Sequence, residues 1–145
     1  MVLLTVCVCT PVVGSVSELE ALIIKKSDGD EISYRVEIAD SDVLRRRGLM
    51  YREHLPGDQG MLLDFRREAR VGIWMKNTYI PLDLLFIDGA GMIIHVHPDA
   101  VPHSTQTIRG GNRVRAVLEI NAGQLEAQGI QVGDRVIFPS FGTGE

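Results

Sequence analysis

The chain has 145 residues, a formal net charge of −4 and a pI near 5.5, which fits one acidic domain. Its composition, 45% apolar and 23% charged residues, is that of an ordinary globular protein. The acidic balance argues against nucleic-acid binding, which normally requires a basic domain or stripe. Only two cysteines are present, Cys7 and Cys9, and one residue separates them, so neither a disulfide framework nor a zinc ribbon is expected.

Residues 1–17 are interpreted as the remnant of a secretory signal. The uncharged apolar run from Val2 to Cys9 has the length of a signal's apolar centre, and small residues after it could form a cleavage site. No Lys or Arg precedes the run, and the alternative is a short strand at the domain edge. The run is too short for a stable membrane span, which takes about 20 residues. We therefore expect a periplasmic or extracellular protein, or a cytoplasmic one if residues 1–17 are not a signal.

The next part of the chain predicts a hairpin followed by a helix. Residues 21–26 form a short apolar run, and residues 31–40 alternate between apolar and polar side chains, as a half-buried strand does. A turn between them makes a hairpin. One of the residues 40–42 can cap a helix that ends near Met50. The three arginines at 45–47 are interpreted as the solvated face of this helix, although they could also contact an anion.

The middle of the chain predicts four more strands, near 60–65, 71–76, 80–88 and 92–98. The sequence Asp-Gly-Ala-Gly at 88–91 predicts a tight hairpin turn between the last two, because glycine accepts a positive φ.

The last third of the chain begins with a polar, glycine-rich loop at 99–113, and loops of this length are often functional. A strand at 114–120 follows, then a short helix at 121–129 with Asn121 as its cap. A final strand at 132–138 precedes a tail.

These elements predict a mainly β (α+β) fold, an antiparallel, barrel-like sheet with two short helices. The domain covers residues 18–140, and residues 141–145 are the tail. A doubly wound α/β fold is not expected, because helices do not alternate with the strands.

Five sequence blocks occur in order along the chain: RGLMYREHLP, GMLLDF, WMKNTYIPLDLLFID, VLEINAG and GIQVGD. Together they resemble the family named domain of unknown function 192, a small domain of bacteria and archaea, over residues 31–138. The resemblance implies a conserved fold and, in many members, an export signal, but no established activity. Leu63 and Ile73 depart from it, since an aromatic residue is common in the family at both positions.

The stretch from Trp74 to Asn77 carries polar and aromatic side chains directly before an apolar strand with one acidic residue, Asp83. A buried carboxylate needs a cation or backbone donors, so Asp83 could pair with Lys76 or Arg52 and pin two strands together. The alternative is a pocket with Trp74 as a stacking wall. In that pocket Lys76, Asn77 and Arg52 would anchor an anionic or sugar-like ligand.

Glu119 lies on an otherwise apolar strand. If it shares a cavity with Asp83, the two carboxylates could perform acid–base chemistry on a bound sugar. Glu119 could equally form an ion pair with Arg113 or Arg115.

His95 and His97 are two residues apart and would point to the same side of a strand, as two ligands of one metal do. A third ligand is needed, such as His103. The same alternation places both histidines on the solvent side without any metal, and neither a metal nor another cofactor is expected.

We therefore expect an exported binding or accessory module that takes a small molecule or a cell-envelope component. Its surface would comprise residues 74–77, Arg52 and the loop 99–113. One alternative is a small hydrolase of envelope polymers that uses Asp83 and Glu119. The other is that the motifs serve the fold alone.

Overall fold

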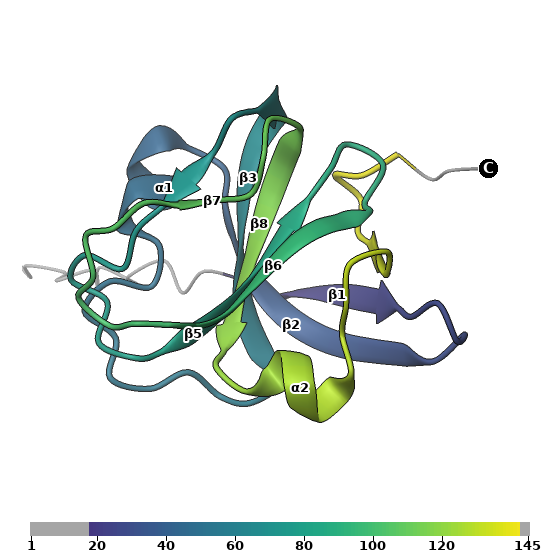
Figure 1. The fold of residues 1–145 in the computed structure, drawn as a ribbon, viewed down its shortest axis with the longest axis horizontal. Coiled ribbons are helices and arrows are strands. Elements are labelled where there is room, and N and C mark those ends of the chain that lie inside the picture. The colour runs from purple at the N-terminus through teal and green to yellow at the C-terminus, as the bar shows by residue number, and fades with distance from the viewer. Residues whose placement is uncertain (1–17, 143–145) are drawn as a thin grey trace, which may run out of the picture.

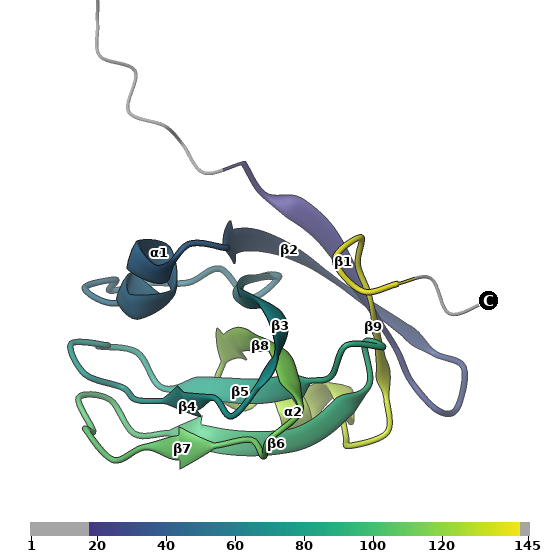
Figure 2. The same ribbon diagram turned by 90° about the horizontal axis from the view of Figure 1, so that it is seen from above.

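The structure, a computed structural model, describes residues 18–142, and seven of its strands form one strongly curved mixed sheet (Figures 1 and 2). The strand order across the sheet is β6-β5-β8-β3-β2-β1-β9. The predicted signal at 1–17 lies outside the described residues. The sheet strands are β1 (Glu20–Lys25), β2 (Glu31–Ala39), β3 (Gln59–Ala69), β5 (Leu82–Ile87), β6 (Ile93–Ala100), β8 (Val114–Asn121) and β9 (Arg135–Ile137).

A two-stranded ribbon and two short helices complete the described part of the chain. The prediction of a mainly β fold with two short helices is confirmed. Within residues 18–142, no helix is long and apolar enough to cross a membrane. The ribbon is formed by β4 (Gly72–Ile73) and β7 (Ile108–Arg109), and the helices are α1 (Asp42–Arg47) and α2 (Gln124–Gln128).

Neighbouring strands of the sheet are antiparallel except β2 and β3, which run parallel. A parallel pair needs a crossover connection, and here α1 and the loop after it carry the chain back. The two ends of the sheet approach each other. Val136 N–H donates to the Gly91 carbonyl at 2.7 Å, and Ile93 N–H donates to the Asp134 carbonyl at 2.9 Å. The sheet is therefore curled in the manner of a half-barrel (Figure 2).

The predicted first hairpin is present. In β1 and β2, Leu22 pairs with Tyr34 and Ile24 pairs with Ile32, around a turn in which Gly29 has a φ of 96°. Leu22, Ile24 and Tyr34 are buried, whereas alternate residues are more exposed. The period-two pattern was a reliable signal here because one face of this hairpin packs on the core and the other faces solvent.

Both helices are shorter than predicted. The Ser41 hydroxyl accepts the Leu44 N–H at 3.2 Å and begins α1, and Gly48, with a φ of 48°, ends it. Helix α2 starts after Gly123 and not at Asn121, because the Asn121 side chain donates to the Leu55 carbonyl at 2.7 Å instead.

The segment 99–113, predicted to be one long loop, contains a short strand. In the β4–β7 ribbon, Gly72 pairs with Arg109 and Ile73 with Ile108. The predicted strand at 71–76 is accordingly reduced to two residues, and the chain leaves it at Trp74.

Two apolar clusters lie on opposite faces of the central strands. In one of these strands, β5, all six residues are buried. Leu85 and Leu118 belong to one cluster, and their chain neighbours Leu84 and Val117 belong to the other. Strand residues alternate between faces, so each side chain of β5 and β8 is assigned to one cluster or the other by its position alone.

Candidate functional site

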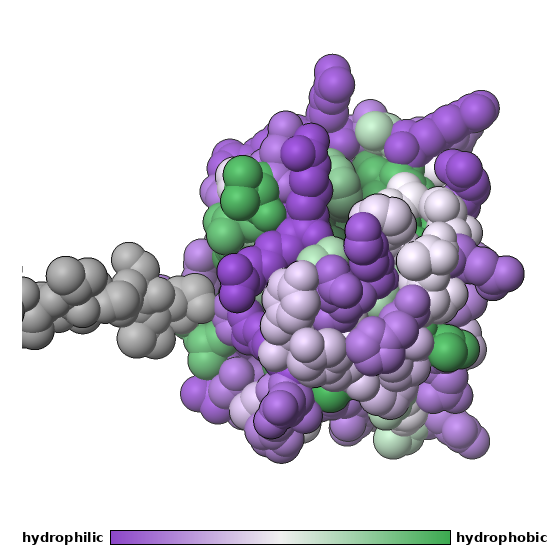
Figure 3. All heavy atoms as spheres, turned by 90° about the vertical axis from the view of Figure 1, so that its left-hand side faces the viewer, coloured by the Kyte–Doolittle hydropathy of each residue, from purple (hydrophilic) through white to green (hydrophobic). Residues whose placement is uncertain are grey.

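A cleft of about 720 Å³ lies between α1 and the β4 segment, with the end of β3 between them. Helix α1 and β4 belong to the end of the molecule at the left of Figure 1, which faces the viewer in Figure 3. The surface there is mostly hydrophilic, with only small hydrophobic patches. The residues that line the cleft include Asp42, Arg45, Arg46, Arg47, Gly48, Phe65, Arg67, Trp74 and Glu119.

Glu119 of β8 lines the base of the cleft. It pairs with Met61 of β3 on one side and with Leu84 of β5 on the other, which fixes its side chain on the α1 side of the sheet. The residue is only 5% exposed, and its Oε2 has no hydrogen-bond partner among the described residues. Gly48 lies next to this oxygen, since a Cβ at that position would be in van der Waals contact with it, at 3.4 Å.

Burial raises the pKa of Glu119 to about 7, against a smaller lowering effect of the Arg52 cation. The carboxyl therefore changes charge near neutral pH. The guanidinium of Arg52 is held by an ion pair, since it donates to both oxygens of Glu37 at 2.5 and 2.7 Å. This pairing also raises the pKa of Arg52.

Trp74 stands at the rim and is 47% exposed, as the pocket hypothesis requires. Lys76 covers part of it, with Nζ 5.2 Å from the ring centroid, a cation–π distance. Asn77 shapes the turn, with a φ of 55°, and its Nδ2 donates to the Tyr51 hydroxyl at 3.0 Å. Trp74 thus lines the cleft, whereas Lys76 and Asn77 support the segment that carries it.

Arginine side chains form much of the wall, and sequence reasoning did not include them in the site. Arg45 is fixed: it donates to the Asp64 carbonyl at 2.6 Å, pairs with Asp42 at 2.5 Å and lies over the Phe65 ring at 5.3 Å.

Arg46, Arg47 and Arg67 also line the cleft, are exposed, and have no ion-pair partner within residues 18–142. The interpretation of the arginine run as a solvated helix face is confirmed for Arg46 and Arg47 but not for Arg45, and the same face borders the cleft. Its sequence signal was the run itself, directly before Gly48.

Asp83 lies on the other face of the sheet. It pairs with Ile120, one position along from the Glu119–Leu84 pair, so the expectation that the two carboxylates share a cavity is wrong. The predicted partners Lys76 and Arg52 are also wrong. Fully buried, Asp83 accepts the N–H of Asp99 at 3.0 Å and the N–H of Leu125 at 2.8 Å, and it thereby ties β6 and α2 to β5.

The other ion pairs proposed for Glu119 are not formed. Arg113 pairs with Glu68 at 3.3 Å, and Arg115 pairs with Asp64. Both arginines are thus held away from Glu119 by other carboxylates.

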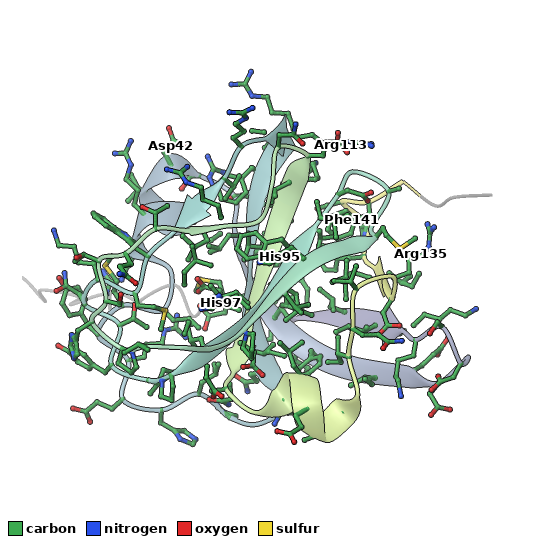
Figure 4. All side chains as sticks on the ribbon, in the orientation of Figure 1. Asp42, His95, His97, Arg113, Arg135 and Phe141 are labelled. Carbon is green, nitrogen blue, oxygen red and sulfur yellow. The ribbon has the colours of Figure 1, made fainter. Side chains whose placement is uncertain are left out.

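The two histidines of β6 are not brought to a third ligand. His95 and His97 both lie on this strand in Figure 4, and the His95 ring is 5.4 Å from Phe86. His103 contacts Tyr79 instead, at 5.4 Å. Among the described residues, no three His, Cys, Asp or Glu side chains are grouped so as to hold a metal.

The fold and the cleft define a small, mainly β domain that holds one buried acidic side chain at the base of an arginine-lined cleft. The chain belongs to the DUF192 family, described as "Uncharacterized ACR, COG1430", whose model matches residues 23–138. The earlier resemblance is therefore confirmed. No curated protein matches the chain.

Two crystal structures are similar to this one. A "putative transcription regulator" from Sinorhizobium meliloti 1021 is 41% identical, with a TM-score of 0.85, over 88% of this chain and 99% of that chain. A protein of unknown function from Novosphingobium aromaticivorans DSM 12444 is 29% identical, with a TM-score of 0.81, over 90% of this chain and 94% of that chain. Both comparisons support the fold and leave the activity open.

Proposed function

We propose that this domain is a binding module that takes a small polar ligand in the cleft between α1 and β4. The observation that carries the proposal is the Oε2 atom of Glu119, which is buried without a hydrogen-bond partner among the described residues. Leaving such an atom unsatisfied costs about 1–3 kcal/mol, more for a charged group. A ligand that enters the cleft and hydrogen-bonds Glu119 removes that cost.

The size and composition of the cleft support this function. Its volume of about 720 Å³ lies within the range of roughly 300–1,000 Å³ that is usual for small-molecule sites. The half-exposed indole of Trp74 at the rim offers a flat apolar contact. A buried group with a displaced pKa inside a cleft is itself a mark of functional sites, and Glu119 has both properties.

Two other functions fit the structure less well. The hydrolase hypothesis required Asp83 and Glu119 in one cavity, and they lie on opposite faces of the sheet. A role in transcription regulation, as in the description of the Sinorhizobium relative, is not favoured, because a net charge of −4 does not favour DNA.

A fragment screen by ¹⁵N–¹H NMR tests the proposal. We expect polar fragments of the cell envelope to shift the amide signals of residues 45–50 and 72–78, and Trp74→Ala to weaken their binding up to about tenfold, because an aromatic contact is worth roughly 0.5–1.5 kcal/mol. Tyr79→Ala is the matched control, since Tyr79 is a similarly exposed aromatic residue, at 44%, outside the cleft lining. Binding that shifts only other amides, or that Trp74→Ala leaves unchanged, would refute this site.

A further inference from the structure

We infer that the ligand is an anionic sugar, whose acidic group lies against Arg46, Arg47 and Arg67 and whose hydroxyl hydrogen-bonds Glu119. The inference rests on the proposed binding function and adds the chemical class of the ligand. Three features of the cleft support it: its charge, the hydrogen-bonding capacity of Glu119, and the flat wall at the rim.

The cleft is positive in a protein that is negative overall. Its lining contains four arginines and two acidic residues. Asp42 is neutralised by Arg45 at 2.5 Å, so the unpaired charges on the walls are the guanidinium groups of Arg46, Arg47 and Arg67. A cluster of one sign against a net charge of −4 attracts a ligand of the opposite sign, and guanidinium matches the planar, two-oxygen geometry of a carboxylate.

The carboxyl at the base selects the group that meets it. Because burial raises the pKa of Glu119 to about 7, this side chain is present both protonated and ionised near neutral pH. An ionised carboxylate only accepts hydrogen bonds, whereas a protonated one can also donate. A hydroxyl both donates and accepts, and so it can bond the Glu119 carboxyl in either state. An ammonium group cannot accept a hydrogen bond, and a positive ligand would also be repelled by the arginines.

The rim of the cleft offers a flat aromatic surface on which a sugar ring can pack. Trp74 presents a half-exposed indole, part of which Lys76 covers at 5.2 Å. The C–H face of a sugar ring packs on such an indole face, and the Lys76 ammonium beside it favours an anion further. A ring that carries both hydroxyls and a carboxylate meets all three features at once.

Glucuronate and glucose are the matched probes, because they share one ring and differ in the carboxylate. We expect glucuronate to shift the amide signals of residues 45–50 and 72–78, and glucose to bind about tenfold more weakly, as expected for the loss of one charge-assisted contact. The double variant Arg46→Gln/Arg47→Gln is expected to reduce glucuronate binding to the level of glucose. Arg135→Gln is its control, since Arg135 lies at the opposite end of the molecule from Asp42 of α1 (Figure 4).

The outcomes separate the ligand class from the binding function. Equal binding of glucose and glucuronate, or glucuronate binding that the double arginine variant leaves unchanged, overturns the anionic class while the cleft remains the site. Binding of benzoate, an anion with a flat ring and no hydroxyl, in the cleft without glucuronate binding overturns the sugar. If fragments bind in the cleft and none of these probes does, the ligand class is wrong while the binding function stands. If neither a probe nor a fragment binds in the cleft, the proposed function is wrong as well.

Discussion

Two buried acidic residues stand on neighbouring strands of the same sheet, and they have opposite environments. Asp83 of β5 is fully buried and accepts two backbone N–H groups, from Asp99 and Leu125. Glu119 of β8 is almost as buried, yet its Oε2 has no partner within the described residues. One position of strand register separates the pairs to which they belong, and that step decides which face of the sheet each carboxyl occupies.

The difference shows that burial of an acidic side chain does not by itself indicate function. Asp83 is hydrogen-bonded to parts of the chain that must be held in place, so its burial is explained by the fold. Its face also carries Tyr34, whose pKa burial raises to about 12, with a further contribution from Asp83. Strand register buries Glu119 too, but no hydrogen bond within residues 18–142 compensates the burial of its Oε2, and a ligand in the cleft could do so.

The largest expected effect is the loss of stability on substitution of Asp83, the carboxylate that is hydrogen-bonded within the fold. Asp83→Ala leaves the N–H groups of Asp99 and Leu125 without their acceptor, and we expect the free energy of unfolding at pH 7 to fall by about 4 kcal/mol, since each unsatisfied buried donor costs about 1–3 kcal/mol. Urea denaturation followed by circular dichroism measures it. Asp88→Ala is the control, because Asp88 accepts the N–H groups of Ala90 and Met92 in a partly exposed turn. A loss no larger than that of Asp88→Ala would mean that the buried hydrogen bonds of Asp83 do not stabilise the fold specially, and the contrast between Asp83 and Glu119 would disappear.

Glu119 is expected to destabilise the fold as the pH rises, and Glu119→Gln to abolish that trend. The pKa of Glu119 is about 7 in the native state and 4.5 as its ordinary value. The native state therefore keeps a proton that the unfolded state has lost, so stability falls between about pH 4.5 and 7, and the penalty is fully present above pH 7. A difference of this size corresponds to about 3 kcal/mol.

The measurement compares wild type with Glu119→Gln by urea denaturation at pH 5 and pH 8. The stability of the variant relative to wild type should increase by up to about 3 kcal/mol over this interval, while the contributions of all other groups cancel in the comparison. An unchanged difference between the two pH values would mean that Glu119 is solvated or paired and needs no ligand to satisfy it.

Much of the fold was predictable from the sequence, because local patterns determined it. The alternation in β2 and the glycine turn before Met92 predicted strands and hairpins that are present. The parallel pairing of β2 with β3 was not predictable, since it depends on the path of the chain through α1. The short strand β7 was also missed, because two residues leave no periodic signal.

The candidate site was predicted in part, and the failures have one cause. Trp74 and Glu119 both line the cleft, whereas Asp83 does not. Strands β5 and β8 are buried on both faces, so apolar residues do not alternate with polar ones along them, and their sequences give no indication of which residues face which cluster. That information comes from the register between Leu84 and Glu119, a contact between distant parts of the chain.

The smallest expected effect concerns Arg52, whose cation lowers the pKa of Glu119 against the larger effect of burial. Arg52→Met should raise the pKa of Glu119 further, because burial then acts unopposed, and the loss of stability with pH should extend above pH 7. Arg52→Lys, which retains the charge, should move that pKa less. The effect is small because Arg52 is already paired with Glu37 through two hydrogen bonds. A ¹³C NMR titration of the Glu119 carboxyl measures it. A pKa of Glu119 that stays the same or falls in Arg52→Met would mean that the Arg52 charge does not act on Glu119. Asp83 and Glu119 would then differ by their hydrogen bonds alone.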